Sequence, residues 1–131
     1  MQQKRSIRSY VLRQGRMTEA KKESIDTLMP KYGIDLSAQQ FDFNEIFGRQ
    51  ADTILEIGFG MGQSLAQMAL DNPDTNYLGI EVHQPGVGRL MYQLESNSIT
   101  NVRVLNEDAV IMLKEHIVDE SLAGVQIFFP D

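Results

Sequence analysis

The segment TILEIGFGMG, residues 53–62, carries the clearest indication of the fold. Its first half, Thr53–Ile57, is a short apolar run that predicts a buried β-strand. Its second half places glycines at positions 58, 60 and 62, where the chain turns sharply and its backbone can approach a ligand closely. The next segment, Ser64 to Leu70, predicts a helix with one apolar face. A strand, a glycine-rich turn and a helix in this order are typical of a ligand-binding α/β domain.

The alternation of strands and helices continues to the end of the chain. The pattern predicts further strands at residues 76–82, 102–105 and 125–129, and further helices around residues 87–94 and 109–116. Such alternation predicts a doubly wound, Rossmann-like parallel sheet with helices on both faces. The strands that complete sheets of this class are missing after the fourth. We therefore expect an N-terminal fragment of a longer protein.

The first fifty residues have a different character. Residues 18–29 predict a helix that Thr18 can cap and that Pro30 and Gly33 end. Residues 34–50 predict a connector with a short helix. The aromatic and aliphatic side chains expected to pack from this connector onto the following domain are Phe41, Phe43, Ile46 and Phe47. We place an arm and helix at residues 1–35 and the Rossmann-like domain at residues 36–131.

Composition limits the classes of function. The chain has 131 residues, no cysteine and two histidines that are far apart, so neither disulfides nor a metal site are expected. It has no apolar run of membrane-spanning length and no signal-peptide pattern, which predicts a cytoplasmic protein without a membrane partner.

Charge is distributed unevenly along the chain. Residues 1–31 carry a net charge of +5 and the remaining hundred carry −11, although the total is −6. By charge alone, the simplest interpretation of the basic segment is a solvated tail.

Acidic residues follow three successive predicted strands. Glu56 lies beside the glycine turn, Glu81 lies at the end of the second strand, and Asp108 follows the third. The carboxyl ends of parallel strands meet at one edge of the sheet, where ligands bind. Glu81 there can accept hydrogen bonds from ribose hydroxyls, and Asp108 can accept one from an adenine amine. Asp108 is also a good N-cap for the helix after it, and the sequence leaves both roles open.

The acids also bear on the kind of cofactor. A pyrophosphate prefers a helix N-terminus without a nearby carboxylate, whereas Glu56 can serve an ammonium group. This favours S-adenosylmethionine over NAD. The last four residues, Phe128 to Asp131, place another carboxylate after a strand, although an ordinary strand end and turn explains the pattern equally well.

Taken together, several segments resemble the bacterial tRNA (guanine-N7)-methyltransferases. These segments are Ile7–Val11, Arg13–Arg16, Leu55–Gly62, Gly79–His83, Pro85–Gly88, Asp108–Ala109 and Phe128–Asp131. The resemblance extends over essentially the whole chain, and its most specific parts are residues 79–88 and the terminal Phe-Phe-Pro-Asp. The family continues beyond Asp131 with further sheet strands and further contacts to tRNA and guanine.

The resemblance implies a function and a set of site residues. The substrate it implies is the guanine at position 46 of the tRNA variable loop, methylated with S-adenosylmethionine. It places Glu56, Glu81 and Asp108 at the cofactor and Asp131 between the cofactor and the guanine. The turn pattern adds Gly58, Gly60 and Gly62 to the cofactor residues. The resemblance also makes Asp131 the catalytic residue beside the guanine, and it assigns Arg8, Arg13 and Arg16 to tRNA binding. A monomer is expected for the longer protein.

Two other functions remain open at this stage. An NAD-dependent oxidoreductase uses the same glycine turn and an acid at the position of Glu81. A non-catalytic module that binds cofactor or RNA also fits, because we expect the fragment alone to have little or no activity and its fourth strand to be an open edge.

Overall fold

The computed structural model of the chain describes residues 25–37, 39–117 and 121–127. Four strands form one parallel sheet, namely β1 (Thr53–Ile57), β2 (Asn76–Ile80), β3 (Val102–Leu105) and β4 (Gly124–Ile127). Their order across the sheet is β3-β2-β1-β4. In the register of the sheet, Leu55 of β1 lies between Leu78 of β2 and Val125 of β4.

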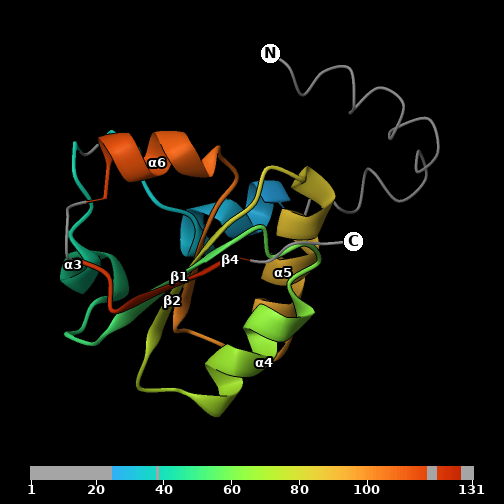
Figure 1. Ribbon diagram of the computed structural model, residues 1–131. Helices are drawn as coiled ribbons and strands as arrows, with labels where there is room; N and C mark the ends of the chain where they lie inside the picture. Colours follow the sequence, from blue (N-terminus) through green and yellow to red (C-terminus); the bar gives the residue numbers. More distant parts are fainter. Residues whose placement is uncertain (1–24, 38, 118–120, 128–131) are drawn as a thin grey trace, which may run out of the picture.

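Helices cover both faces of this sheet. They are α3 (Phe43–Phe47), α4 (Gln63–Asp71), α5 (Gln84–Ser96) and α6 (Ala109–Glu115). The helices α4 and α5 lie on one face together with the helical residues 25–32, and α3 and α6 lie on the other (Figure 1). Each face has its own apolar cluster. The doubly wound α/β class predicted from the sequence is therefore confirmed.

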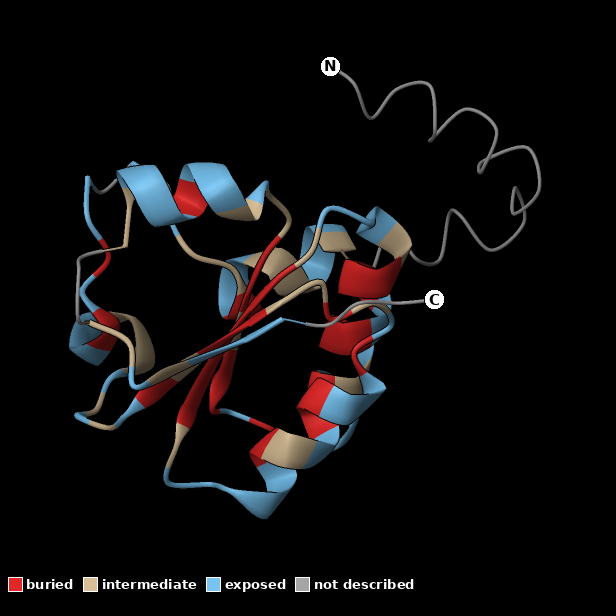
Figure 2. Cartoon of the chain, in the orientation of Figure 1, coloured by how far each residue is buried: buried red, intermediate tan, exposed pale blue. Residues whose placement is uncertain are grey.

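Burial falls across the sheet toward β4. All five residues of β2 are buried, because β2 has neighbours on both sides and helices on both faces. In contrast, Val125 is 52% exposed and Ile127 is 55% exposed in β4, which pairs only with β1 within the described residues. Figure 2 shows buried central strands beside an exposed fourth strand.

The connector before β1 packs as predicted. Phe41 and Phe43 are buried in the cluster on the α6 face, and Ile46 and Phe47 pack against it. Asp42 begins α3 because its carboxylate accepts hydrogen bonds from the backbone N–H groups of the next turn.

The predicted end of the first helix at Pro30 is wrong, since the helix continues to residue 32 before Gly33 ends it. Proline removes one helical hydrogen bond and disfavours the helix at this point, so contacts of the residues after it have to hold the last turn. The last turn is held by Tyr32, which is 1% exposed and whose hydroxyl donates a 2.7 Å hydrogen bond to Glu95 of α5. The predicted beginning of the helix, including Thr18, lies outside the described residues.

The predicted second strand is also too long, because β2 ends at Ile80 rather than at residue 82. Beyond it, the side-chain amide of Asn106 donates to the backbone carbonyls of Glu81 and Val82 at 2.8 and 3.1 Å. The Asn106 side chain thus occupies the backbone carbonyls that β2 would use for strand pairing if it continued to residue 82. The fourth strand begins at Gly124, one residue earlier than predicted, and residues 128–129 lie outside the described residues.

The order of the strands locates the ligand edge. The chain builds β1, β2 and β3 outward in one direction, and then crosses back to place β4 on the other side of β1. Open α/β sheets bind ligands outside the carboxyl ends of the strands where the order reverses in this way. That point lies between β1 and β4, directly beside the glycine turn that follows Ile57.

Candidate functional site

The glycine loop, residues 58–62, leaves the carboxyl end of β1 and leads into α4. Gly58, Gly60 and Gly62 have φ values of 74°, 64° and 83°, in the left-handed region that side chains disfavour. The loop is anchored at its base by a 2.8 Å hydrogen bond from the Gly58 N–H to the Ile80 carbonyl. Each of the three glycines predicted to approach a cofactor therefore has a backbone conformation that favours glycine.

Glu81 lies next to this loop, immediately after β2. Its Oε1 accepts a 2.7 Å hydrogen bond from the N–H of Gly60, and its Oε2 accepts one of 3.1 Å from the N–H of His83. An ionised carboxylate offers about four lone-pair sites, so two acceptor positions remain for a ligand. The structure thus brings the predicted ribose acceptor and the predicted cofactor loop into direct contact.

Glu56 is the most buried acid of the site. It lies within β1 between Gly79 of β2 and Gln126 of β4, and it is only 7% exposed. Burial raises the pKa of the Glu56 carboxyl above its ordinary value of 4.5. Within the described residues, the Glu56 carboxylate accepts no hydrogen bond and forms no ion pair. A buried carboxylate of this kind favours a cationic partner.

Asp108 is the N-cap of α6. Its Oδ1 accepts hydrogen bonds from the N–H groups of Val110 at 2.8 Å and Ile111 at 3.4 Å. The capping role that the sequence left open is therefore present. The other oxygen, Oδ2, accepts no hydrogen bond within the described residues, and the residue is exposed. Contact with an adenine amine stays a prediction that this geometry permits.

Several predicted site residues fall beyond the described part of the chain. Asp131, with Phe128 to Pro130 before it, lies outside the described residues, as do Arg8, Arg13 and Arg16. Their predicted contacts with guanine, cofactor and tRNA remain predictions from the sequence.

Asn106 is a site residue that the sequence pattern did not indicate. Its side chain ties the segment after β3 to the backbone at Glu81, two residues before Asp108. The three chain segments that carry Gly60, Glu81 and Asp108 are thereby joined at the sheet edge. A single asparagine after a strand gives no periodic signal, so only the fold reveals this role.

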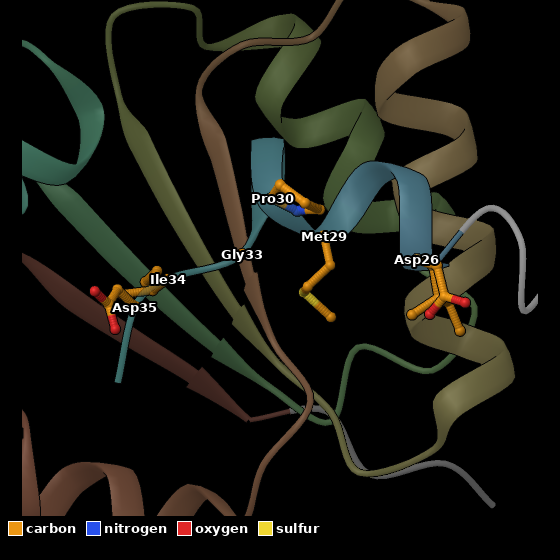
Figure 3. A pocket seen from close by; sticks show the side chains of 7 residues that line it. Asp26, Met29, Pro30, Gly33, Ile34 and Asp35 are labelled. Atoms are coloured by element: carbon orange, nitrogen blue, oxygen red, sulfur yellow. The ribbon is translucent and has the colours of Figure 1, made fainter. Parts of the chain in front are cut away.

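A separate groove lies beside the helical residues 25–32. It has a volume of about 470 Å³ and is lined by Ile25, Asp26, Met29, Pro30, Gly33, Ile34 and Asp35. In Figure 3, Met29 lies in the middle of this groove, with Asp26 toward one end and Asp35 toward the other. None of the predicted cofactor residues lines it, so we treat it as distinct from the site at the sheet edge.

The described part of the chain offers neither a membrane span nor a metal cluster. No helix in residues 25–37, 39–117 and 121–127 is long and apolar enough to cross a membrane. Within the same ranges, no three or more His, Cys, Asp or Glu side chains are grouped so that they could hold a metal ion.

The sheet, the glycine loop and the acids at the strand ends define a Rossmann-like cofactor-binding domain. Residues 50–131 match a family model described as "Putative methyltransferase", and the chain belongs to this methyltransferase family. A solved structure of an antibiotic-related methyltransferase shares the fold with a TM-score of 0.56. It is 16% identical, and the match covers 77% of this chain and 51% of that one.

Relatives of higher identity are found among curated proteins. The chain is 55% identical over 128 residues to the tRNA (guanine-N(7)-)-methyltransferase of Hydrogenovibrio crunogenus, covering 98% of this chain and 53% of that protein. It is 50% identical over 127 residues to the enzyme of the same name from Shewanella amazonensis, covering 97% and 53%. The resemblance predicted from the sequence motifs is confirmed. The chain spans about half the length of the curated relatives that it matches.

Proposed function

We propose that this chain forms the cofactor-binding half of an S-adenosylmethionine-dependent enzyme that methylates N7 of guanine 46 in the variable loop of tRNA. The observation that carries the proposal is the contact between Gly60 and Glu81 at the sheet edge. In the proposal, Glu81 is the ribose acceptor and the glycine loop holds the cofactor, in a chain of a methyltransferase family. The names of the relatives supply the substrate.

The charge of the edge favours S-adenosylmethionine over a dinucleotide. Glu56, Glu81 and Asp108 are all acids, and a pyrophosphate placed among them is repelled by like charge. The methionine ammonium and the sulfonium of S-adenosylmethionine are cations, and a buried carboxylate without a partner is stabilised by a cation. An NAD-dependent oxidoreductase is therefore the weaker candidate, and the family match does not favour it.

Each described acid has a role in this proposal. Glu56 holds the ammonium group, Glu81 accepts from the ribose hydroxyls with its remaining lone pairs, and Asp108 accepts from the adenine amine with Oδ2. The glycine loop lets the backbone approach the bound cofactor without side-chain interference. When bound, S-adenosylmethionine would supply an electrophilic methyl group, whose carbon–sulfur bond breaks as the bond to nitrogen forms, with S-adenosylhomocysteine as the leaving group.

Catalysis requires little acid–base chemistry from the chain. Guanine N7 has an exposed lone pair, so no proton has to be removed before it attacks the methyl carbon. The protein aligns N7 with the methyl group and stabilises the positive charge that develops on the guanine. In the proposal, Asp131 stabilises this charge and accepts hydrogen bonds from the guanine N1–H and amino groups.

The basic segment supplies the tRNA contacts of the proposal. Residues 1–31 have a net charge of +5, which suits the phosphate backbone, and Arg8, Arg13 and Arg16 are the residues assigned to it. A cytoplasmic location and a monomeric longer protein are part of the same proposal.

Calorimetry separates the two cofactor classes. S-adenosylhomocysteine and NAD are titrated in turn into this chain and into a fusion. The fusion continues residues 1–131 with the part of the Hydrogenovibrio crunogenus relative that lies beyond the match. The proposal predicts saturable binding of S-adenosylhomocysteine and no measurable binding of NAD. Binding of NAD, or of neither ligand by the fusion, contradicts it.

A further inference from the structure

The helix α5 lies directly against the glycine loop, although it follows a different strand. Gly86, in its first turn, faces the backbone of Gly60, since a Cβ added to Gly86 lies only 2.0 Å from the Gly60 carbonyl oxygen. Leu90, one turn later, fills the space beside Gly62, where an added Cβ lies 2.6 Å from the Leu90 Cβ.

A third contact completes this face of the helix. The side-chain amide of Gln93 donates a hydrogen bond of 3.2 Å to the backbone carbonyl of Met61. Residues 86, 90 and 93 lie on one helical face, because residues three and four positions apart are neighbours on a helix. Three consecutive loop residues, Gly60 to Gly62, are therefore each met by one residue of α5.

We propose that Gly86, Leu90 and Gln93 form a brace, made of positioning residues that hold the glycine loop in its cofactor-binding form before the cofactor arrives. The inference rests on the proposed function for the identity of the cofactor. A loop that is ordered in advance loses less conformational entropy on binding, and affinity rises accordingly. The brace and the Glu81 contact act on the same loop from two sides.

Gly86 offers the clearest argument for the brace. Inside a helix, glycine is less favourable than alanine by about 1 kcal/mol, so helix propensity alone predicts that Gly86→Ala is stabilising. The structure predicts the reverse, because real Cβ atoms essentially never come within 3.0 Å of another heavy atom and this one lies at 2.0 Å from a backbone oxygen. Either the loop or α5 has to move.

Gln93 allows a milder test. Gln93→Leu removes the donor to Met61 and shortens the side chain by one atom, whereas Gln93→Lys keeps a donor. Gln67→Leu in α4 is the matched control, since the Gln67 amide donates to the exposed Asp71 at 3.0 Å and not to the loop. Gly124→Ala is the control for Gly86→Ala, because its added Cβ makes only an ordinary contact of 3.9 Å with Ile54.

The first readout is amide hydrogen exchange of residues 58–62 in the free chain, which requires no cofactor. We expect about fivefold faster exchange in Gln93→Leu, the equivalent of one net hydrogen bond. Gly86→Ala should show a larger increase, and Gln93→Lys and both controls should show no change. Amides of β2 serve as the internal reference for global unfolding. Unchanged loop exchange in both Gln93→Leu and Gly86→Ala overturns the brace.

The second readout is the dissociation constant of S-adenosylhomocysteine, measured on the fusion. We expect it to rise about fivefold in Gln93→Leu and at least about tenfold in Gly86→Ala, with recovery in Gln93→Lys. If the unaltered fusion does not bind S-adenosylhomocysteine, the proposed function fails while the exchange result still decides the brace. If it binds and all variants bind equally, the brace fails while the proposed function stands.

Discussion

The backbone N–H of Gly60 donates a 2.7 Å hydrogen bond to Oε1 of Glu81, and this bond joins the turn after β1 to the acid after β2. The two residues are 21 positions apart in the sequence. The bond unites two features that the sequence pattern assigns separately to the cofactor. It also means that Glu81 has a structural role in the loop as well as its proposed role toward the ribose.

These two roles of Glu81 can be separated by substitution. Glu81→Gln keeps a side-chain acceptor for Gly60 but loses the negative charge, whereas Glu81→Ala loses both. Hydrogen bonds to charged groups contribute about 1.5–3 kcal/mol, so we expect Glu81→Gln to weaken S-adenosylhomocysteine binding by about tenfold to a hundredfold. Calorimetry on the fusion measures this change. Full affinity in Glu81→Gln would remove the residue from the ribose site.

Glu56 should show a conflict between stability and binding. Because its pKa is raised in the folded chain, the folded state binds more protons than the unfolded state above pH 4.5. Glu56 therefore lowers the free energy of unfolding as the pH rises through this region. We expect Glu56→Gln to be more stable than the unaltered chain at pH 7 and to lose this advantage below pH 4.5, as measured by urea unfolding.

The same substitution should weaken cofactor binding, because the neutral amide no longer pairs with the methionine ammonium. A Glu56→Gln variant that is less stable at pH 7 would contradict the burial argument. A variant that binds S-adenosylhomocysteine normally would contradict the assignment to the ammonium group.

Two substitutions separate the capping role of Asp108 from its proposed role in cofactor binding. Asp108→Ala removes the hydrogen bonds to Val110 and Ile111 and should cost about 1 kcal/mol of stability. Asp108→Asn keeps a good N-cap, so its stability should be close to that of the unaltered chain. If Oδ2 holds the adenine, both variants bind S-adenosylhomocysteine more weakly. Normal binding by Asp108→Asn would leave the residue with its capping role alone.

The arm prediction concerns salt dependence. Replacing Arg8, Arg13 and Arg16 with glutamine in the fusion should weaken tRNA binding. The slope of log affinity against log salt should fall by about one for each phosphate that the arm no longer neutralises. Filter binding at several salt concentrations measures the slope. If the slope does not change when the three arginines are replaced, the basic segment does not contact tRNA phosphates and is a solvated tail.

Most of the fold could be predicted from the sequence. The apolar run of β1, the helix positions after it and the alternation that follows were all readable, because period and turn residues are local signals. The errors arose where distant contacts override local signals. Pro30 does not end its helix because Tyr32 is buried against α5, and β2 ends early because Asn106 reaches across to it.

The site divides in the same way. Glycines with left-handed φ values and acids after strands have recognisable patterns, so Gly60 and Glu81 could be named in advance. The hydrogen bonds of Asn106 and Gln93 join segments that are 25 and 32 residues apart, and nothing in their local sequence indicates a partner. Gly86 gave a weak indication of a close contact, because a glycine inside a helix often has a packing reason.

The most direct experiment on the proposed activity is methyl transfer to tRNA. The fusion is incubated with S-adenosylmethionine carrying a labelled methyl group and with unmodified tRNA, and the modified nucleoside is identified after digestion. The proposal predicts labelled 7-methylguanosine from the variable loop and, in Asp131→Asn, a loss of turnover that is larger than the loss of affinity for S-adenosylhomocysteine. Label on another atom, or no label while the intact Hydrogenovibrio crunogenus relative is active in parallel, would contradict it.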